Sequence, residues 1–141
     1  MILLDTDHAT VLKYRDTERC QRLMTRLAMV ADDEIGTTII TVEEQMRGWL
    51  ASIAKERKVS RQIAPYRELV GLFDFFSDFE ILSLEEKAVA IFDQFSRIRI
   101  GTMDRKIAAI ALANDALLLP ANARISGRFP GFDLKTGSNE P

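Results

Sequence analysis

Three acidic residues of this sequence are candidates for a chemical role. Asp5 ends the apolar run Met1–Leu4, Glu44 follows a β-branched segment by about one helical turn, and Asp104 lies in the first turn of a helix. Carboxylates brought close together repel one another unless a cation neutralises them. Sites built only from oxygen ligands suit Mg²⁺ or Mn²⁺, and such an ion stabilises charge on a phosphodiester under attack by water. The three acids therefore predict a metal site for phosphodiester chemistry, provided that they converge.

Each acid also has a purely structural explanation. Aspartate is a common turn residue, so Asp5 could simply end a strand, and Asp7 is predicted as a helix cap. Thr41 and Glu44 have the spacing of a capping box, in which each side chain bonds the other residue's backbone. Asp104 favours its own helix, because it faces the positive end of the backbone dipoles. If all these explanations hold, the protein is a small α/β domain whose acids only cap helices.

The elements that must position these acids alternate between strands and helices. Short apolar or β-branched runs predict strands at 1–5, 34–40, 79–82, 116–120 and, less extensively, 132–134. Helical periodicity predicts helices at 7–13, 17–30, 41–54, 65–77, 83–98 and 102–114, with Ser83–Glu86 as a second capping box and Thr102 as a helix cap. This alternation predicts an α/β fold with a mostly parallel sheet covered by helices on both faces. In such a fold, ligands bind and functional residues lie at the carboxyl ends of the strands.

The helix predicted at 65–77 carries an apolar stripe of five large residues. These are Tyr66, Leu69, Val70, Phe73 and Phe76. Exposed area on this helix, or on the helix that carries Trp49, would suit a dimer. The simpler expectation is that both stripes belong to the core.

The bulk composition is that of an ordinary globular domain. Of 141 residues, 47% are hydrophobic and 28% are charged, so we expect one domain over 1–134 and a disordered tail at 135–141. No run suits a membrane span or a signal peptide, and the single Cys20 allows no internal disulfide, so a cytoplasmic protein is expected. A net charge of −2 makes any nucleic-acid contact local or metal-mediated.

Four segments of the chain resemble the PIN domain family, and within it the VapC-like toxins of bacterial toxin–antitoxin pairs. The segments are Leu3-Leu-Asp5-Thr-Asp7-His, Ile40-Thr-Val-Glu-Glu44-Gln-Met-Arg-Gly48, Arg99-Ile-Gly-Thr-Met-Asp104-Arg-Lys-Ile-Ala-Ala109, and Asn122 through Gly131. The resemblance implies a compact three-layer α/β/α sandwich with a short, mostly parallel central sheet. It also implies a Mg²⁺- or Mn²⁺-dependent ribonuclease, which forms a homodimer and is held by a cognate antitoxin near the acidic groove.

The same resemblance assigns roles to individual residues. Asp5, Glu44 and Asp104 take the places of the family's metal ligands and organisers of the attacking water. Thr6 and Asn122 match positions near that site, and Asp7 is a further candidate beside them.

One position departs from the family pattern. A fourth acid usually follows the asparagine by three residues, whereas this chain has Ile125 there. Isoleucine cannot ligate a metal, and the loss of one carboxylate weakens the binding of hard cations. The alternative function is therefore a degenerate PIN domain that binds an antitoxin or RNA with weak or no cleavage.

Arginines near the predicted site are candidates for contacts with RNA phosphates. Arg99 and Arg105 flank Asp104, and Arg124 follows Asn122. Such contacts give affinity rather than sequence choice. The alternative for each of them is a solvated surface charge that balances the acids.

Overall fold

The computed structural model of the chain describes residues 1–5, 18, 21, 35–97 and 99–119. The helices predicted at 7–13 and 17–30, the strand predicted at 132–134 and the tail at 135–141 lie outside the described residues. So do the site candidates Thr6, Asp7, Asn122 and Arg124, together with Ile125.

Four short parallel strands form the sheet. They are β1 (Ile2–Leu4), β2 (Ile35–Thr38), β3 (Glu80–Leu82) and β4 (Leu117–Leu119), in the order β3-β2-β1-β4. Leu4 of β1 pairs with Thr37 on one side and with Leu119 on the other, so the carboxyl ends of these three strands lie level with one another. The predicted parallel α/β sheet is confirmed.

The central strand β1 is buried on both faces. Leu3 packs with Ile40, Ile110 and Leu118 in one cluster, whereas Ile2 and Leu4 pack on the other face against partly buried neighbours that include Phe79. Successive side chains of a strand point to opposite faces, which explains why one short strand contributes to two clusters. A run of consecutive apolar residues is therefore what this position in the sheet requires.

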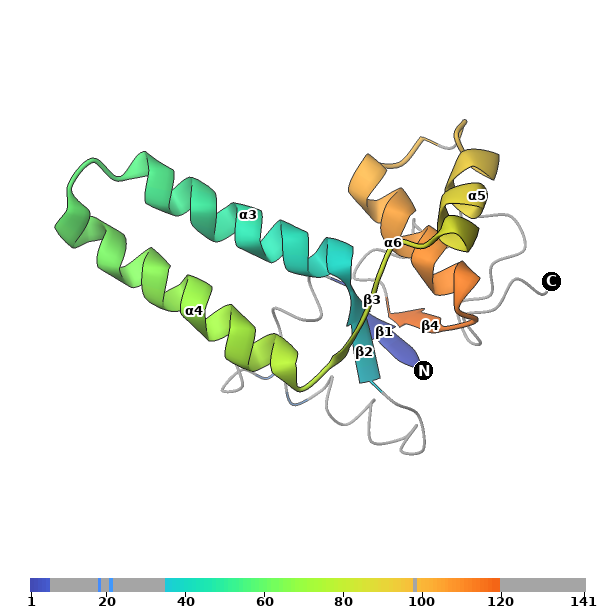
Figure 1. Cartoon of the computed structure of the whole chain (residues 1–141), viewed down its shortest axis with the longest axis horizontal. Helices are drawn as coiled ribbons and strands as arrows, with labels where there is room; N and C mark the ends of the chain where they lie inside the picture. Colours follow the sequence, from blue (N-terminus) through green and yellow to red (C-terminus); the bar gives the residue numbers. More distant parts are fainter. Residues whose placement is uncertain (6–17, 19–20, 22–34, 98, 120–141) are drawn as a thin grey trace.

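Two pairs of helices accompany the sheet (Figure 1). Helices α3 (Ile39–Lys55) and α4 (Ile63–Ser77) pack against each other as a long hairpin, joined through the short 3₁₀ helix η1 (Val59–Gln62). Helices α5 (Glu86–Gln94) and α6 (Thr102–Ala113) pack together on the other side of the molecule, and α6 covers the face of the sheet to which Leu3 points. No helix of the described residues is both long and apolar enough to cross a membrane.

Three predicted helix starts are wrong. Helix α4 begins at Ile63, two residues before the predicted start at 65. Helix α3 begins at Ile39, two residues before the predicted start at 41, because Thr38 caps it and accepts a hydrogen bond from the backbone N–H of Thr41 at 3.2 Å. Helix α5 begins at Glu86, and Glu85 precedes it in an extended conformation without a side-chain cap. The predicted capping box from Ser83 to Glu86 is therefore not formed.

The predicted core stripe of α4 is also largely wrong. Tyr66, Val70 and Phe73 are 50%, 66% and 67% exposed, while Leu72 and Phe76 are buried. The buried residues of α4 are Pro65, Leu72 and Phe76, and an apolar surface remains exposed.

Candidate metal centre

Asp5 lies directly after β1, at the carboxyl edge of the sheet, and is only 7% exposed. The hydroxyl of Thr37 donates a 2.8 Å hydrogen bond to the carbonyl oxygen of Leu4, the residue before Asp5. This bond joins the end of β2 to the end of β1 through two buried groups. It fixes the backbone from which the carboxylate of Asp5 projects.

A pair of buried threonines turns the chain directly from β2 into α3. The hydroxyls of Thr38 and Thr41 lie 3.4 Å apart, and both side chains are fully buried. No loop residue separates the strand from the helix. The sequence does contain a signal for this junction, namely the pair Thr37-Thr38 with a third threonine, Thr41, three residues later. The prediction that the helix begins at Thr41 did not use it.

The position of Glu44 follows from this junction. Because Thr38 is the cap, the first turn of α3 contains no acid, and Glu44 falls in the second turn, where it is half-buried. The capping-box explanation of Glu44 is therefore wrong. Its neighbour Glu43 forms an ion pair with Arg47, at 2.6 Å between carboxylate and guanidinium.

Asp104 is the third residue of α6 and the only acid in its first turn. Gly101 occupies the cap position, and Thr102, the expected cap, is instead the first residue of the helix. One carboxylate oxygen of Asp104 lies 3.8 Å from the point where a Cβ on Gly101 would stand, so the side chain folds back over the helix N-terminus. The favourable interaction with the helix dipole therefore applies to Asp104.

The topology turns the start of α6 towards the same edge as Asp5. After α6 the chain passes through Asn114–Ala116 into β4, whose Leu117 N–H donates to the carbonyl of Met1 at 2.9 Å. Helix α6 thus ends at the amino edge of the sheet. Its 12 residues span roughly 18 Å, so Asp104 lies at the end of α6 that is remote from β4.

The described residues do not form a ready metal site. No group of three or more His, Cys, Asp or Glu side chains among them is arranged to hold a metal ion. Asp5, Glu44 and Asp104 each take part in an interaction within the protein. Their oxygen donors suit Mg²⁺ or Mn²⁺ in chemical type. Their action as one joint site stays a prediction.

The two described arginine candidates differ in their surroundings. Arg99 is exposed. The guanidinium of Arg105 lies over the ring of Phe92, 3.7 Å from its centre, and donates to the carbonyl of Ser96 at 3.0 Å. Arg105 therefore joins α5, the following turn and α6. Its expected contact with RNA phosphate stays a prediction.

Comparison with known proteins agrees with this fold. A family model described as PIN domain matches residues 2–126. No curated protein sequence matches the chain. Among solved structures, the DNA-bound VapBC of Salmonella typhimurium has a TM-score of 0.69 at 22% identity, covering 92% of each chain.

Two further solved structures give the same result. VapBC2 of Rickettsia felis, bound to a DNA fragment from its promoter, has a TM-score of 0.67 at 22% identity and covers 92% of this chain and 94% of its own. FitAcB of Neisseria gonorrhoeae has a TM-score of 0.64 at 21% identity, covering 89% and 90%. At this level of identity the likeness concerns the fold.

Proposed function

The chain belongs to the PIN domain family, and from that premise we propose that it is a divalent-metal-dependent endoribonuclease. We further propose that it acts in the cytoplasm as the toxin of a VapBC-like toxin–antitoxin pair. PIN domains are generally nucleases, and the similar solved structures are VapBC and FitAB complexes. The observation that supports the proposal is the buried Asp5 directly after the central strand β1, at the carboxyl edge of the sheet.

In this proposal Asp5 and Asp104 hold the metal, and Glu44 assists them and positions the attacking water. Mg²⁺ is commonly held by one or two carboxylates together with waters and substrate phosphates, so three preassembled protein ligands are not required. When bound, the ion supplies charge stabilisation to the phosphodiester and makes a coordinated water more acidic. Thr37 acts on the site by holding the backbone before Asp5.

The remaining candidates complete the proposed site. Thr6, Asp7 and Asn122 orient metal ligands or phosphate, while Arg99, Arg105 and Arg124 contact RNA phosphates. The partners are an antitoxin and a second copy of the chain, as the resemblance implies.

The test is cleavage of structured RNA with added Mg²⁺ or Mn²⁺. Loss of a metal ligand is expected to lower the rate by about 100-fold or more in Asp5→Asn and Asp104→Asn. Glu44→Gln is expected to reduce it less. Matched controls are Glu43→Gln, next to Glu44, and Asp93→Asn, an exposed residue of α5, both with unchanged rates. Equal rates in Asp5→Asn and the wild type would refute the role of Asp5.

A second candidate function is a degenerate PIN domain that binds RNA or an antitoxin without cutting RNA. Two observations favour it: Ile125 replaces the family's fourth acid, and no preassembled group of three ligands exists among the described residues. It predicts that the wild type shows no metal-dependent cleavage and that Ile125→Asp gains some. Cleavage by the wild type that depends on Asp5 would exclude it.

A further inference from the structure

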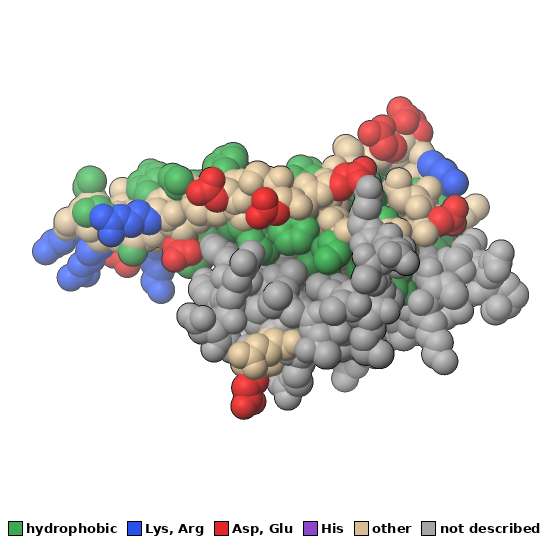
Figure 2. Space-filling model, turned by 90° about the horizontal axis from the view of Figure 1, so that it is seen from below, with side chains coloured by type: hydrophobic (Ala, Val, Ile, Leu, Met, Phe, Trp, Pro, Cys, Tyr) green, Lys and Arg blue, Asp and Glu red, His purple; other side chains and the backbone are tan. Residues whose placement is uncertain are grey.

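Basic side chains gather at the end of the α3–α4 hairpin that is remote from the sheet. We call this group the basic tip, and its members are the exposed residues Lys55, Arg57, Lys58 and Arg61. With the single acid Glu56 they give the segment 55–61 a net charge of +3, whereas the whole chain has −2. In Figure 2 blue side chains form a group at this end of the hairpin. The rest of the chain is therefore acidic, and the positive potential is local.

The fold itself does not account for the basic tip. Basic side chains near the end of a helix commonly bind its last carbonyl groups. Here the side-chain amide of Gln62 donates to the carbonyls of Ile53 and Glu56, at 3.1 and 2.9 Å, so the cations are not needed for that purpose. None of the four forms an ion pair with another described residue. Their charges are therefore available to an anionic partner from solution.

One exposed face of α3 leads from Glu44 to the basic tip. Gly48, Ala51 and Lys55 come four, seven and eleven residues after that carboxylate, so they share its side of the helix. Gly48 and Ala51 are exposed, and an added Cβ on Gly48 would have no atom within 4 Å beyond the adjacent residues and the backbone of its own helix. No side chain larger than a methyl group therefore lies on this line between Glu44 and Lys55. The line is roughly 16 Å long at 1.5 Å per residue.

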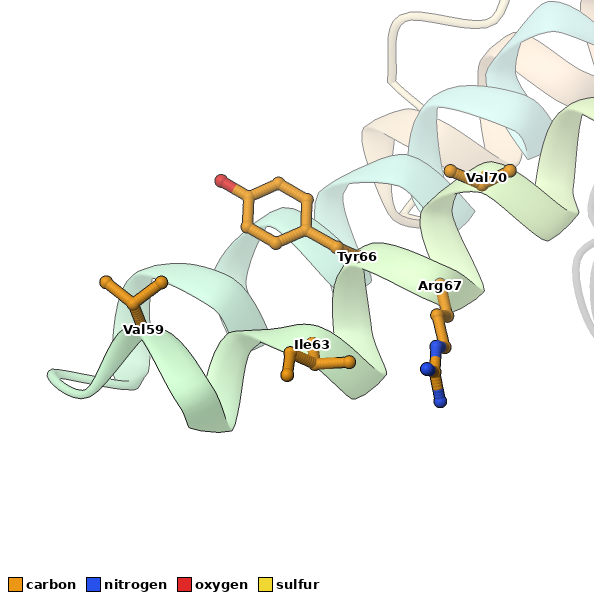
Figure 3. Close-up of a pocket in the computed structure, with 5 residues that line it drawn as sticks. All are labelled: Val59, Ile63, Tyr66, Arg67 and Val70. Carbon is orange, nitrogen blue, oxygen red and sulfur yellow. The ribbon is translucent and has the colours of Figure 1, made fainter.

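The other helix of the hairpin offers a different surface beside the basic tip. There η1 and α4 form a hollow of about 430 Å³, lined by Val59, Ile63, Tyr66, Arg67 and Val70. Figure 3 shows Tyr66 and Arg67 extending to different sides of α4. Four of the five lining residues are hydrophobic, so a phosphate group would lose its hydration there without enough hydrogen-bond partners. A polyanion held by the basic tip therefore meets the more favourable surface on α3.

From the basic tip and the open face of α3 we propose a second contact surface for the RNA substrate. A single strand lies along α3, with the bond to be cut near Glu44 and with phosphates further along the strand held by the basic tip. A helical strand has about 3.4 Å of axis per nucleotide, so the distance corresponds to roughly five nucleotides. The inference rests on the proposed ribonuclease function and adds a surface for its substrate outside the candidate metal centre.

Contacts of this kind give affinity without sequence choice, because every nucleotide carries the same phosphate. Their strength depends on the number of neutralised phosphates rather than on an exact spacing of the cations. The basic tip thus holds the strand, and the choice of the cleaved bond is left to the groups around Glu44.

The probe is a fluorescently labelled single-stranded RNA of about twelve nucleotides. It is mixed with the full chain in EDTA, so that binding is measured without cleavage, and fluorescence anisotropy gives the dissociation constant at several salt concentrations. The tip variant carries Lys55→Gln, Arg57→Gln, Lys58→Gln and Arg61→Gln together. We expect it to bind about tenfold or more weakly at low salt. Each lost phosphate contact lowers the salt slope by about 0.7, so the slope should fall by up to about 2.8.

Single substitutions provide matched controls. Lys58→Gln removes one charge from the basic tip, and Lys87→Gln removes one charge from an exposed lysine of α5. The first should lower the salt slope by about 0.7 and the second should leave it unchanged. Gly48→Leu tests the path along α3 without a change in charge. It should weaken RNA binding by about threefold or more through steric conflict with the strand, whereas Gly48→Ala binds like the wild type. Neither replacement of this helical glycine should lower the melting temperature.

Equal RNA binding by the tip variant and the wild type, or no binding by either, would overturn the inference. So would undiminished binding by Gly48→Leu. Sedimentation with phosphatidylserine vesicles tests the other anionic partner: if the tip variant loses vesicle binding and keeps RNA binding, the basic tip serves a membrane surface instead. A wild type that binds RNA as expected but does not cut it with Mg²⁺ or Mn²⁺ would contradict the nuclease proposal alone. Metal-dependent cleavage with RNA binding that is indifferent to the basic tip would contradict this inference alone.

Discussion

Single hydrogen bonds at the carboxyl edge of the sheet fix the backbone before Asp5 and the start of α3. The Thr37 hydroxyl satisfies a buried carbonyl, and the Thr38 side chain satisfies the backbone N–H of Thr41. Buried polar groups of this kind are costly when they lose their partner. Threonine at these positions is therefore a requirement of the site rather than a preference for β-branched residues in a strand.

The first prediction concerns Thr37. Thr37→Val keeps the shape of the side chain but leaves the carbonyl of Leu4 without its 2.8 Å donor. We expect the free energy of unfolding to fall by about 1–3 kcal/mol in urea titrations, whereas Thr37→Ser restores most of it. Thr102→Val is the control, because Thr102 is exposed and no side-chain cap bond forms at that helix start. Equal losses in Thr37→Val and Thr37→Ser would contradict the role of the hydroxyl.

The second prediction concerns Arg105. Arg105→Lys retains the charge but loses the planar group that stacks on Phe92 and reaches the carbonyl of Ser96. The expected cost is about 1–2 kcal/mol of unfolding free energy, measured by thermal or urea denaturation. Arg99→Lys, at an exposed arginine, should change stability by less than about 0.5 kcal/mol. If Arg105 instead contacts phosphate, Arg105→Lys will leave stability intact and lower the affinity for RNA.

At the scale of elements, the existence of each described α-helix and strand was predictable, whereas the 3₁₀ helix η1 and several boundaries and faces were not. The observed start of α3 differs from the predicted one because Thr38, and not Thr41, is the cap. Threonine is a favourable cap residue at either position, so the sequence alone does not distinguish them. The face of α4 was mistaken because its apolar residues form two lines, and periodicity alone does not say which line meets α3. Which apolar line of α4 is buried depends on how α3 packs against it, and the local sequence of α4 does not contain that information.

The third prediction concerns the glycines of these elements. In β2, a Cβ on Gly36 would lie 2.8 Å from the backbone oxygen of Glu80 in β3, which does not yield as a flexible side chain would. Gly36→Ala should therefore lower the unfolding free energy by about 1–3 kcal/mol. For the helical glycines Gly48 and Gly71, an added Cβ would have no atom within 4 Å beyond the adjacent residues and the backbone of its own helix. Alanine there should stabilise by about 0.5–1 kcal/mol. A neutral Gly36→Ala would mean that the two strands separate easily.

At the scale of the whole molecule, the parallel sheet followed from alternating elements, but the strand order β3-β2-β1-β4 came only from the structure. The sequence placed Asp5 at a strand end correctly, since a buried strand followed by an acid is a local pattern. The distance between Asp5, Glu44 and Asp104 depends on how α3 and α6 pack, which no local pattern records. Convergence of the acids was thus the part of the candidate site that the sequence left open.

The fourth prediction concerns metal binding and global stability. If Asp5 and Asp104 hold an ion in the folded state alone, Mn²⁺ at about 100 times its dissociation constant should raise the unfolding free energy by about 2.7 kcal/mol. The rise should disappear on chelation and be absent in Asp5→Asn, while Asp93→Asn retains it. Thermal denaturation with and without Mn²⁺ measures this independently of cleavage. A full rise in Asp5→Asn would place the ion elsewhere.

The loop-free junction between β2 and α3 also governs where the chain can change in length. One residue inserted between Thr38 and Glu44 would rotate that carboxylate by about 100° around the helix axis and carry it off the edge. The same insertion in the exposed segment 55–61 alters only the far end of the hairpin. Insertions and deletions among descendants of this sequence should therefore occur mostly in the segment 55–61. The number of residues between the end of β2 and the carboxylate at position 44 should stay constant.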